Sequence, residues 1–295
     1  MAKNVALVLS SGGARGIAHI GVIEQLLEMG YKITSVSGTS IGSLIGGLFA
    51  VEHLNDYKNW IASLDSGDVF SLMDFQLNSA GFIKGKKVFN HMKQWLSEHN
   101  IEDLSIPYTA VATDIINRKE IVFDKGSLVD AIRASVAVPG FISPLYYNDK
   151  WLFDGGVVNP LPLNRVKRKK GDILVAVNLN AFVENQMVER KNTMLDNVKQ
   201  FPQLTEIMNW YQERFGNDKQ KPKKLDMSYL SLMNQMFDMM QEQISDFTLQ
   251  QTPPDILINI PRDACSTFEF HKSKEIIEIG KKEALVAVEK FQNKS

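Results

Sequence analysis

The spacing of apolar and polar residues along the chain alternates between patterns typical of strands and patterns typical of helices. Residues 5–9 are apolar throughout, which predicts a strand buried on both faces and hence a parallel sheet covered by helices. Residues 14–29 carry apolar side chains close to helical spacing and are followed by Gly30, which predicts a helix and its end. Further strand-like segments lie at residues 33–36, 108–116, 120–123, 145–153, 172–178 and 256–260, and further helix-like segments at residues 41–51, 88–96, 128–136 and 273–291. Because strands alternate with helices, the sequence predicts an α/β fold.

Residues 181–254 differ from the rest of the chain in their methionine content. They carry eight of the twelve methionines, which are Met187, Met194, Met208, Met227, Met233, Met236, Met239 and Met240. The pattern predicts a helical insertion into a single domain that spans residues 1–295, with an amphipathic helix at residues 225–249. Methionine suits adaptable apolar surfaces, so this helix is a candidate for the border of an acyl-chain entrance or for a homodimer contact, besides plain packing onto the core.

Composition and charge are those of an ordinary globular protein. Hydrophobic residues make up 44% and charged residues 23%, and the formal net charge is −1, so no strong overall field favours nucleic acid or an anionic membrane as a partner. The single cysteine, Cys265, cannot form an intrachain disulfide, which suits a reducing compartment. Neither a signal peptide nor a run of about 18 apolar residues is evident, and we therefore expect a cytoplasmic protein without a spanning helix.

Gly38–Gly42 has the pattern G-x-S-x-G between a predicted strand and a predicted helix. A sharp turn in this context exposes a serine hydroxyl, and the small residues Gly38 and Gly42 let the flanking backbone pack closely. The following helix would direct its positive N-terminal end toward a developing oxyanion. These features predict Ser40 as a nucleophile, while capping of the helix by Thr39 or Ser40 is the alternative without chemistry.

Ser11–Gly16 forms a second turn between a strand and a helix, and it contains Gly12 and Gly13. If the two strands are parallel neighbours, both turns lie at the edge of the sheet where α/β proteins bind ligands. Peptide N–H groups of a glycine turn can converge on an anion. A dinucleotide-binding turn is the competing interpretation, but Ser11 occupies the place of its first glycine and residues 33–38 contain no acidic residue.

Asp154 ends a predicted hairpin strand and precedes Gly155 and Gly156. A serine nucleophile needs a general base, and a partly buried aspartate within hydrogen-bond reach can serve, whereas a plain Asp-Gly turn is the alternative. His19 and His271 are further candidates for the base. No group of His, Cys and carboxylate residues has the spacing of a zinc site, so we expect no metal and no other cofactor.

Four segments together resemble the bacterial patatin-like phospholipases. They are residues 9–22, Gly38–Gly42, residues 131–139 and residues 154–160, in the order and spacing of that family. The resemblance covers about residues 3–180 and extends to the strand near 255–260 and to the terminal helix. Ser11 departs from the family pattern, because many members carry a glycine at that position.

The resemblance implies a three-layer patatin-like fold, in which a mostly parallel central sheet has helices on both faces. It also implies a lipid acyl hydrolase of the phospholipase A or lysophospholipase type that uses a Ser40–Asp154 dyad. The oxyanion hole would consist of N–H groups from Gly12, Gly13 and Ala14. Arg15 and Gly16 would order that loop or contact the substrate, with Arg15 the candidate for a polar head group. The remaining motif positions, which flank the site, are Gly38, Gly42, Gly155 and Gly156.

The implied substrate is a phospholipid or another acyl-ester lipid, so a membrane surface is a candidate for peripheral contact. The basic run at residues 167–170 is a candidate contact for anionic lipid heads, although a solvated helix end is the commoner role of such a run. A non-catalytic lipid-binding or regulatory protein with the same fold is the alternative from a different class. The intact Ser40, Asp154 and glycine turn favour the enzyme.

Overall fold

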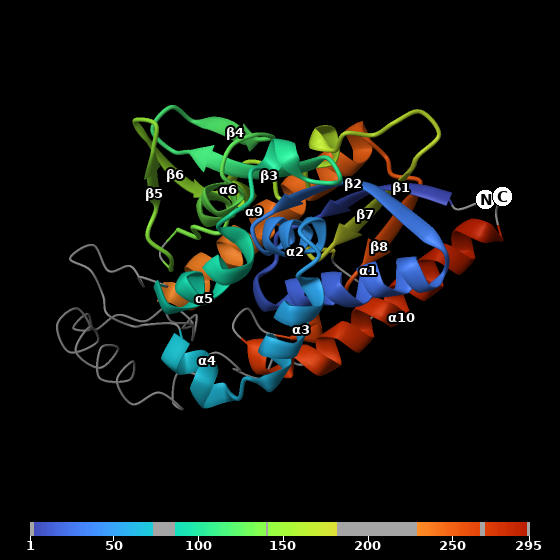
Figure 1. The fold of residues 1–295 in the computed structure, drawn as a ribbon, viewed down its shortest axis with the longest axis horizontal. Coiled ribbons are helices and arrows are strands. Elements are labelled where there is room, and N and C mark those ends of the chain that lie inside the picture. Colours follow the sequence, from blue (N-terminus) through green and yellow to red (C-terminus); the bar gives the residue numbers. More distant parts are fainter. Residues whose placement is uncertain (1–2, 73–85, 140, 182–228, 266–268, 294–295) are drawn as a thin grey trace, which may run out of the picture. The chain divides into compact units, whose positions relative to one another are not determined.

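A computed structural model describes residues 3–72, 86–139, 141–181, 229–265 and 269–293 (Figure 1). Its described strands form one eight-stranded sheet. The parallel part has the order β3-β2-β1-β7-β8 and consists of β1 (Lys3–Leu9), β2 (Tyr31–Thr39), β3 (Tyr108–Asp114), β7 (Ile173–Asn178) and β8 (Ile256–Asn259). The antiparallel strands are β4 (Lys119–Phe123), β5 (Leu145–Tyr147) and β6 (Lys150–Asp154). The predicted α/β fold with a mostly parallel sheet is confirmed.

Two elements differ from the prediction in length, and each difference has a local cause. The helix expected at 14–29 is divided into a 3₁₀ helix, Gly13–Ile17, and the α-helix α1, Ala18–Glu28. Gly13 has φ 59°, which an α-helix cannot accommodate. β2 continues beyond residue 36 to Thr39, because β1 and β3 pair with its two edges as far as this end.

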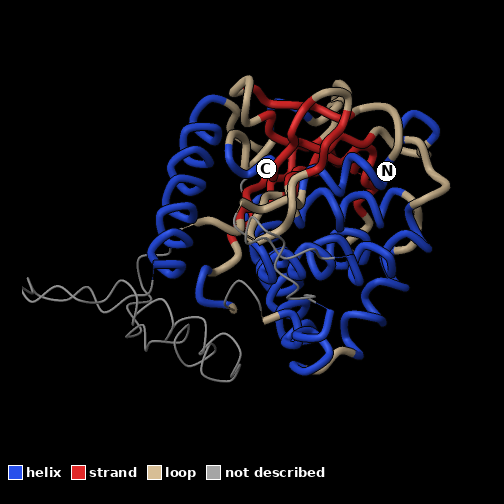
Figure 2. Tube along the Cα trace, turned by 90° about the vertical axis from the view of Figure 1, so that its left-hand side faces the viewer, coloured by secondary structure: helices blue, strands red, loops and turns tan. Residues whose placement is uncertain are grey.

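Helices cover both faces of the sheet, as Figure 2 shows for the strands in red and the helices in blue. Side chains of β1 alternate between the two faces: Val5, Leu7 and Leu9 join the larger apolar cluster, and Ala6 and Val8 join the smaller one. The larger cluster includes residues of α1, α2 (Ile41–Ala50), α3 (Leu54–Ser63), α5 (Lys86–Leu96), α6 (Leu128–Ser135) and α10 (Ser273–Gln292). The smaller cluster is covered by residues 161–166 and by Leu249 of α9 (Tyr229–Gln251). A further short helix, α4, spans Ser66–Leu72.

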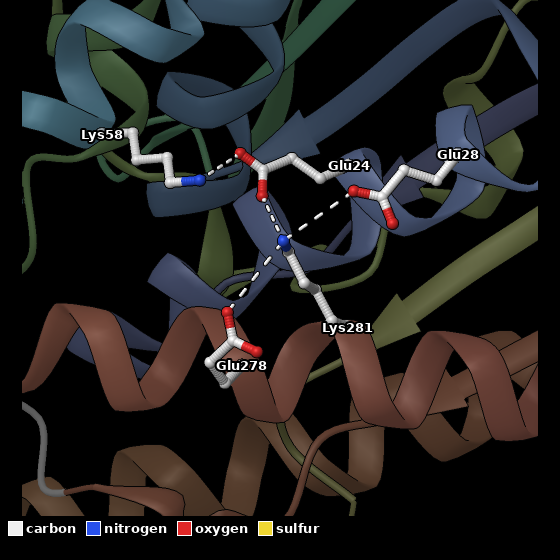
Figure 3. Close-up of polar contacts among 5 residues, drawn as sticks. All are labelled: Glu24, Glu28, Lys58, Glu278 and Lys281. Atoms are coloured by element: carbon white, nitrogen blue, oxygen red, sulfur yellow. Dashed lines mark hydrogen bonds and ion pairs between the residues drawn. The ribbon is translucent and has the colours of Figure 1, made fainter.

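An ionic cluster joins α1, α3 and α10 on the side of the larger apolar cluster (Figure 3). The carboxylate of Glu24 accepts a hydrogen bond from Lys58 at 2.6 Å and pairs with Lys281 at 3.1 Å. Lys281 also lies 3.9 Å from Glu28 and 4.0 Å from Glu278. Burial alone would raise the pKa of Glu24, but the hydrogen bonds and charges of the two lysines lower this pKa overall. The cluster therefore favours the ionised carboxylate and fixes the three helices relative to one another.

Strand β3 brings the carboxyl ends of β2 and β6 together. Residues 110–111 of β3 pair with both β2 and β4, and residues 112–114 pair with both β4 and β6. Because a strand has only two edges, β4 occupies one edge of β3, and β2 and β6 share the other. β2 ends with Thr39 opposite Val111, and the antiparallel β6 ends with Asp154 opposite Ala112. The residue after β2 and the last residue of β6 are therefore neighbours.

The chain divides into two compact units, residues 1–183 with 241–295, and residues 184–240. Residues 182–228 of the predicted insertion, with Met187, Met194, Met208 and Met227, lie outside the described residues. Within the first unit, α9 buries the polar Gln241 and Ser245, whereas Phe247 of the predicted apolar stripe is 62% exposed. Among the described residues, no helix combines the length and the apolar character that crossing a membrane requires.

The described methionines of the second unit, Met233, Met236, Met239 and Met240, have exposed side chains. The division into a single domain with an insertion stays a prediction. So does the position of the helix at an acyl entrance or a homodimer contact.

Candidate active site

Ser40 lies in a strained turn between β2 and α2. It is the N-cap residue of α2 and has φ 56° and ψ −126°, in a region that residues with a Cβ rarely adopt. Its N–H donates to the Ser135 hydroxyl at 2.9 Å, and that hydroxyl donates to the Val111 carbonyl at 2.6 Å. Ser43 donates from both its N–H, at 2.9 Å, and its hydroxyl, at 2.6 Å, to the Ser40 carbonyl. These bonds from α6, β3 and α2 hold the turn in its conformation.

The glycines of this turn allow approaches that no other residue permits. A Cβ at Gly38 would lie 2.4 Å from the backbone of Gly42, and a Cβ at Gly42 would lie 2.2 Å from the carbonyl oxygen of Leu9. Both distances are far below van der Waals contact. The N-terminus of α2 consequently packs directly against the end of β1.

Asp154 is hydrogen-bonded to Ser40. The Ser40 hydroxyl donates to Asp154 Oδ2 at 2.5 Å, and the N–H of Gly156 donates to Asp154 Oδ1 at 2.7 Å. Both side chains are buried, with exposed fractions of 6% for Ser40 and 1% for Asp154. Burial raises the pKa of Asp154 to about 7, although the hydrogen bonds from Ser40 and Gly156 oppose this rise. A carboxyl with this pKa can accept and release a proton near neutral pH.

Gly155 is needed at this end of β6, because a Cβ there would lie 2.2 Å from the carbonyl oxygen of Val111. The loop that follows is tied to β2, since the Thr39 hydroxyl donates to the Asn159 carbonyl at 2.8 Å.

The glycine turn follows β1, the strand beside β2, and so lies at the same edge of the sheet as Ser40. The N–H of Ser11 donates to the Pro160 carbonyl at 2.9 Å, which ties the turn to the loop after Asp154. Gly13 and Ala14 open the 3₁₀ helix, where the first N–H groups have no acceptor within the helix. Within the described part of the chain, no other acceptor is found for the N–H groups of Gly12, Gly13 and Ala14.

The neighbouring motif residues Arg15 and Gly16 are both buried. Nη1 of Arg15 donates to the Arg262 carbonyl over 3.5 Å, so this side chain contacts the segment after β8. Gly16 leaves room for Ile41 of α2, because a Cβ there would lie 2.1 Å from the Ile41 side chain. Both contacts connect the glycine turn to its surroundings.

The two histidines considered as bases lie elsewhere. His19 is buried in α1, and its Nε2 bonds to the Ser10 carbonyl at 2.9 Å. Burial lowers the pKa of His19 to about 4, against the opposing effect of the Ser10 bond, so the ring is neutral. His271 is exposed in the short 3₁₀ helix Phe270–Lys272. The structure therefore brings Asp154, and neither histidine, to the hydroxyl of Ser40.

Gln241 of α9 is a site residue that the sequence did not indicate. The Ser11 hydroxyl donates to Gln241 Oε1 at 2.9 Å, and both side chains are buried. Nε2 of Gln241 lies so close to Gly156 that a Cβ there would approach it to 2.2 Å. Asn180 Nδ2 donates to the Ser11 carbonyl at 3.3 Å. Ser11, which departs from the family pattern, thus has its own partner in α9.

We expect Gln241→Leu to lower the free energy of unfolding by about 1 kcal/mol, because the Ser11 hydroxyl loses its acceptor and the glycine turn loses one hydrogen bond. Urea denaturation measures the effect. In a Ser11→Gly background the same change should cost almost nothing, since no hydroxyl then needs the acceptor. Equal losses in both backgrounds would assign the effect to packing instead.

Metal-binding side chains do not gather in the described residues, where no group of three or more His, Cys, Asp or Glu side chains is placed to hold an ion. Cys265 is buried, and burial raises the pKa of its thiol to about 12 despite the charge of Arg15. The thiol is therefore protonated at neutral pH and is a poor nucleophile.

Comparison with known proteins finds a matching family model and several similar proteins. The sequence model of the family described as "Patatin-like phospholipase" matches residues 7–166. An uncharacterized NTE family protein of Mycobacterium bovis is 32% identical over 98% of this chain and 92% of its own length. Lysophospholipase NTE1 of Coccidioides immitis is 29% identical over 99% of this chain and 18% of its own length. Human patatin-like phospholipase domain-containing protein 6 is 27% identical over 94% of this chain and 20% of its own length.

Proposed function

The chain belongs to the patatin-like phospholipase family, and from this premise we propose that it hydrolyses lipid acyl esters with a Ser40–Asp154 dyad. The observation that carries the proposal is the buried hydrogen bond of 2.5 Å between the Ser40 hydroxyl and Asp154. The strained turn that presents Ser40 after a strand supports the role of this residue as nucleophile. The pKa of Asp154, which burial raises to about 7, supports its role as the base.

In the first half of the reaction, Ser40 Oγ forms a bond to the ester carbonyl carbon while its proton passes to Asp154 Oδ2. The electron pair of the carbonyl moves to its oxygen. As the tetrahedral intermediate collapses, the carbon–oxygen bond to the alcohol breaks and Asp154 gives its proton to that alcohol. The product of this half is an acyl-enzyme on Ser40.

In the second half, water attacks the acyl-enzyme and gives a proton to Asp154. Collapse of the second intermediate breaks the bond to Ser40 Oγ, which takes the proton back, and releases the fatty acid. The N–H groups of Gly12, Gly13 and Ala14 hold the negative oxygen of both intermediates. The positive N-terminal end of α2 adds to this stabilisation. Arg15 holds the glycine turn through Arg262.

The first substrate class to test is a lipid with a single acyl chain. Relatives that are named lysophospholipases align with almost all of this chain, although the chain spans about a fifth of their length. A lysophospholipid carries a single acyl ester near its polar head group. The buried dyad can attack this ester without cleaving a second chain.

The test is to incubate purified protein with lysophosphatidylcholine, diacyl phosphatidylcholine and a chromogenic short-chain ester, and to follow fatty acid release by mass spectrometry. We expect release by the wild type and by Ser63→Ala, which removes an exposed hydroxyl of α3, but not by Ser40→Ala. A fluorophosphonate probe should label the first two proteins only. A folded wild type that neither releases fatty acid nor takes the label would instead favour a non-catalytic lipid-binding protein.

A further inference from the structure

Exposed apolar side chains gather on two neighbouring hairpins next to the dyad. Ile115 and Ile116 lie in the turn between β3 and β4 and are 42% and 71% exposed. Tyr146 on β5 and Trp151 on β6 are 56% and 47% exposed, and their ring centroids lie 5.0 Å apart. We term Ile115, Ile116, Tyr146 and Trp151 the edge patch. Figure 1 shows the β5–β6 hairpin and β4 at the same end of the sheet.

The edge patch lies beyond the end of the sheet at which the dyad forms. Along the shared edge of β3, Asp154 pairs with Ala112 and Leu152 pairs with Asp114. β6 therefore leads outward from Asp154 to Trp151, a separation of about 10 Å at the rise of a strand. Ile115 directly follows Asp114 at the carboxyl end of β3. A surface that touches the edge patch consequently faces the end of the sheet that carries Ser40.

Both hairpin turns have defined conformations. Asp114 accepts hydrogen bonds from the N–H of Asn117 at 3.1 Å and from its side-chain amide at 2.8 Å. The β5–β6 turn uses Asn148 and Asp149, with φ 47° and 60°. These values match the tight two-residue turn that suits twisted hairpins. The exposed apolar side chains are thus presented by a preformed backbone.

Cations flank the edge patch. Arg118, Lys119 and Lys150 are exposed in the same two hairpins. Asp149 places an exposed carboxylate beside them, and its Oδ1 accepts a hydrogen bond from the Tyr146 hydroxyl at 3.1 Å. Besides the hydrogen bonds from Asn117, the charge of Lys150 also lowers the pKa of Asp114. Aromatic side chains with a polar tip and basic residues around apolar ones are the combination found where proteins meet a lipid–water interface. The charge complements anionic lipid head groups.

The basic run at residues 167–170, in contrast, is partly paired within the protein. Only the short 3₁₀ helix Leu163–Arg165 precedes it. Arg165 pairs with Glu120, Lys167 lies 3.2 Å from Asp124, and Arg168 lies 2.5 Å from Asp255. Lys167 and Arg168 are therefore paired with carboxylates, while Lys169 and Lys170 are exposed.

We propose that the edge patch docks the protein onto the surface of an anionic phospholipid bilayer, with Ile115, Ile116 and Trp151 entering the interface and Arg118, Lys119 and Lys150 contacting head groups. The proposal builds on the proposed lipid hydrolase function, because docking at this end of the sheet brings lipid esters to Ser40. Binding itself requires no turnover and can be measured separately.

The test uses full-length Ser40→Ala protein, which binds without hydrolysis, and co-sedimentation with vesicles of phosphatidylcholine alone or with an equal part of phosphatidylglycerol. We expect binding to the anionic vesicles, weakened by salt. Adding Ile115→Ser with Ile116→Ser, or Arg118→Glu with Lys119→Glu, should lower the partition coefficient by roughly tenfold. Turnover of a short soluble ester by the same variants in the Ser40 background should stay unchanged.

Matched controls come from α10, where Val286 is exposed by 51% and Lys282 and Lys290 are exposed cations. Val286→Ser, and Lys282→Glu with Lys290→Glu, should leave vesicle binding unchanged. Equal effects of the edge and α10 variants, or no preference of the wild type for anionic vesicles, would overturn the docking proposal. Vesicle binding that depends on the edge patch supports docking even if no lipid is hydrolysed, so the two proposals fail separately.

Discussion

Asp154→Asn and Ser40→Ala are each expected to lower the hydrolysis of a short soluble ester by about a thousandfold or more. Asparagine keeps the size of the side chain and an acceptor for the Gly156 N–H, but it cannot take the proton of Ser40. Alanine removes the attacking oxygen. Steady-state kinetics with the chromogenic ester measure both losses. Near-normal turnover by the Asp154 variant would remove that residue from the role of base.

The double variant should be little worse than either single variant, because the two residues act as one unit. Residual activity in all three proteins would then reflect the backbone N–H groups alone. His19→Ala serves as a control for the histidine alternative, since His19 bonds to Ser10 and not to Ser40. If His19→Ala with a normal fold abolished activity, the base would have to be reassigned.

The pH profile of the wild type should rise with pH to a midpoint near 7, because Asp154 must be ionised before it accepts the proton. The same shift affects stability with the opposite sign. Folding raises the pKa of Asp154 from 3.8 to about 7, so the native state binds a proton that the unfolded state has released. The free energy of unfolding therefore falls as pH rises from about 4 to 7, by an amount on the order of 4 kcal/mol. Asp154→Asn should therefore be more stable than the wild type at pH 8, with an advantage that shrinks toward pH 4. A variant that is less stable at pH 8 would mean that the substitution disrupts the site.

Gly42→Ala is expected to destabilise the fold by about 3 kcal/mol and to reduce ester hydrolysis roughly a hundredfold. The added Cβ would lie 2.2 Å from the Leu9 carbonyl oxygen and 2.7 Å from the Ser10 carbonyl oxygen. Backbone atoms cannot rotate away as a side chain can. The N-terminus of α2 must then move off β1 and carry Ser40 away from Asp154. Urea denaturation and ester kinetics measure the two effects.

Gly67→Ala is the matched control for this substitution. Gly67 is also the second residue of a helix, α4, but it is exposed and its added Cβ would meet only a side-chain oxygen of Asp65 at 3.2 Å. Alanine has the higher helix propensity, so this variant should be as stable as the wild type or slightly more stable. If Gly42→Ala behaved in the same way, the close packing of α2 on β1 would be contradicted.

Features that depend on a few successive residues could be predicted from the sequence. The apolar run of β1, the hairpin strand that ends at Asp154, and the strand–serine–helix pattern around Ser40 are all of this kind. Their conformations follow from local sterics, hydrogen bonds and the need to bury apolar side chains. The division of the first helix at Ile17 was missed, because the conformation of Gly13 and the approach of Ile41 to Gly16 interrupt a hydrophobic period that continues through them.

By itself the sequence determined which residues have suitable chemistry, whereas the tertiary structure decided which of them meet. Asp154 and His19 were both plausible bases, and the choice between them depends on β3, whose shared edge places the end of β6 beside Ser40. Gln241 lies 230 residues from Ser11, and its helix buries a polar face that the apolar period did not indicate. The spacing of apolar residues within a segment indicates which of its side chains can be buried. Strand pairing and helix packing between residues far apart in the sequence determine which side chain contacts which. These interactions depend on the energy of the whole fold.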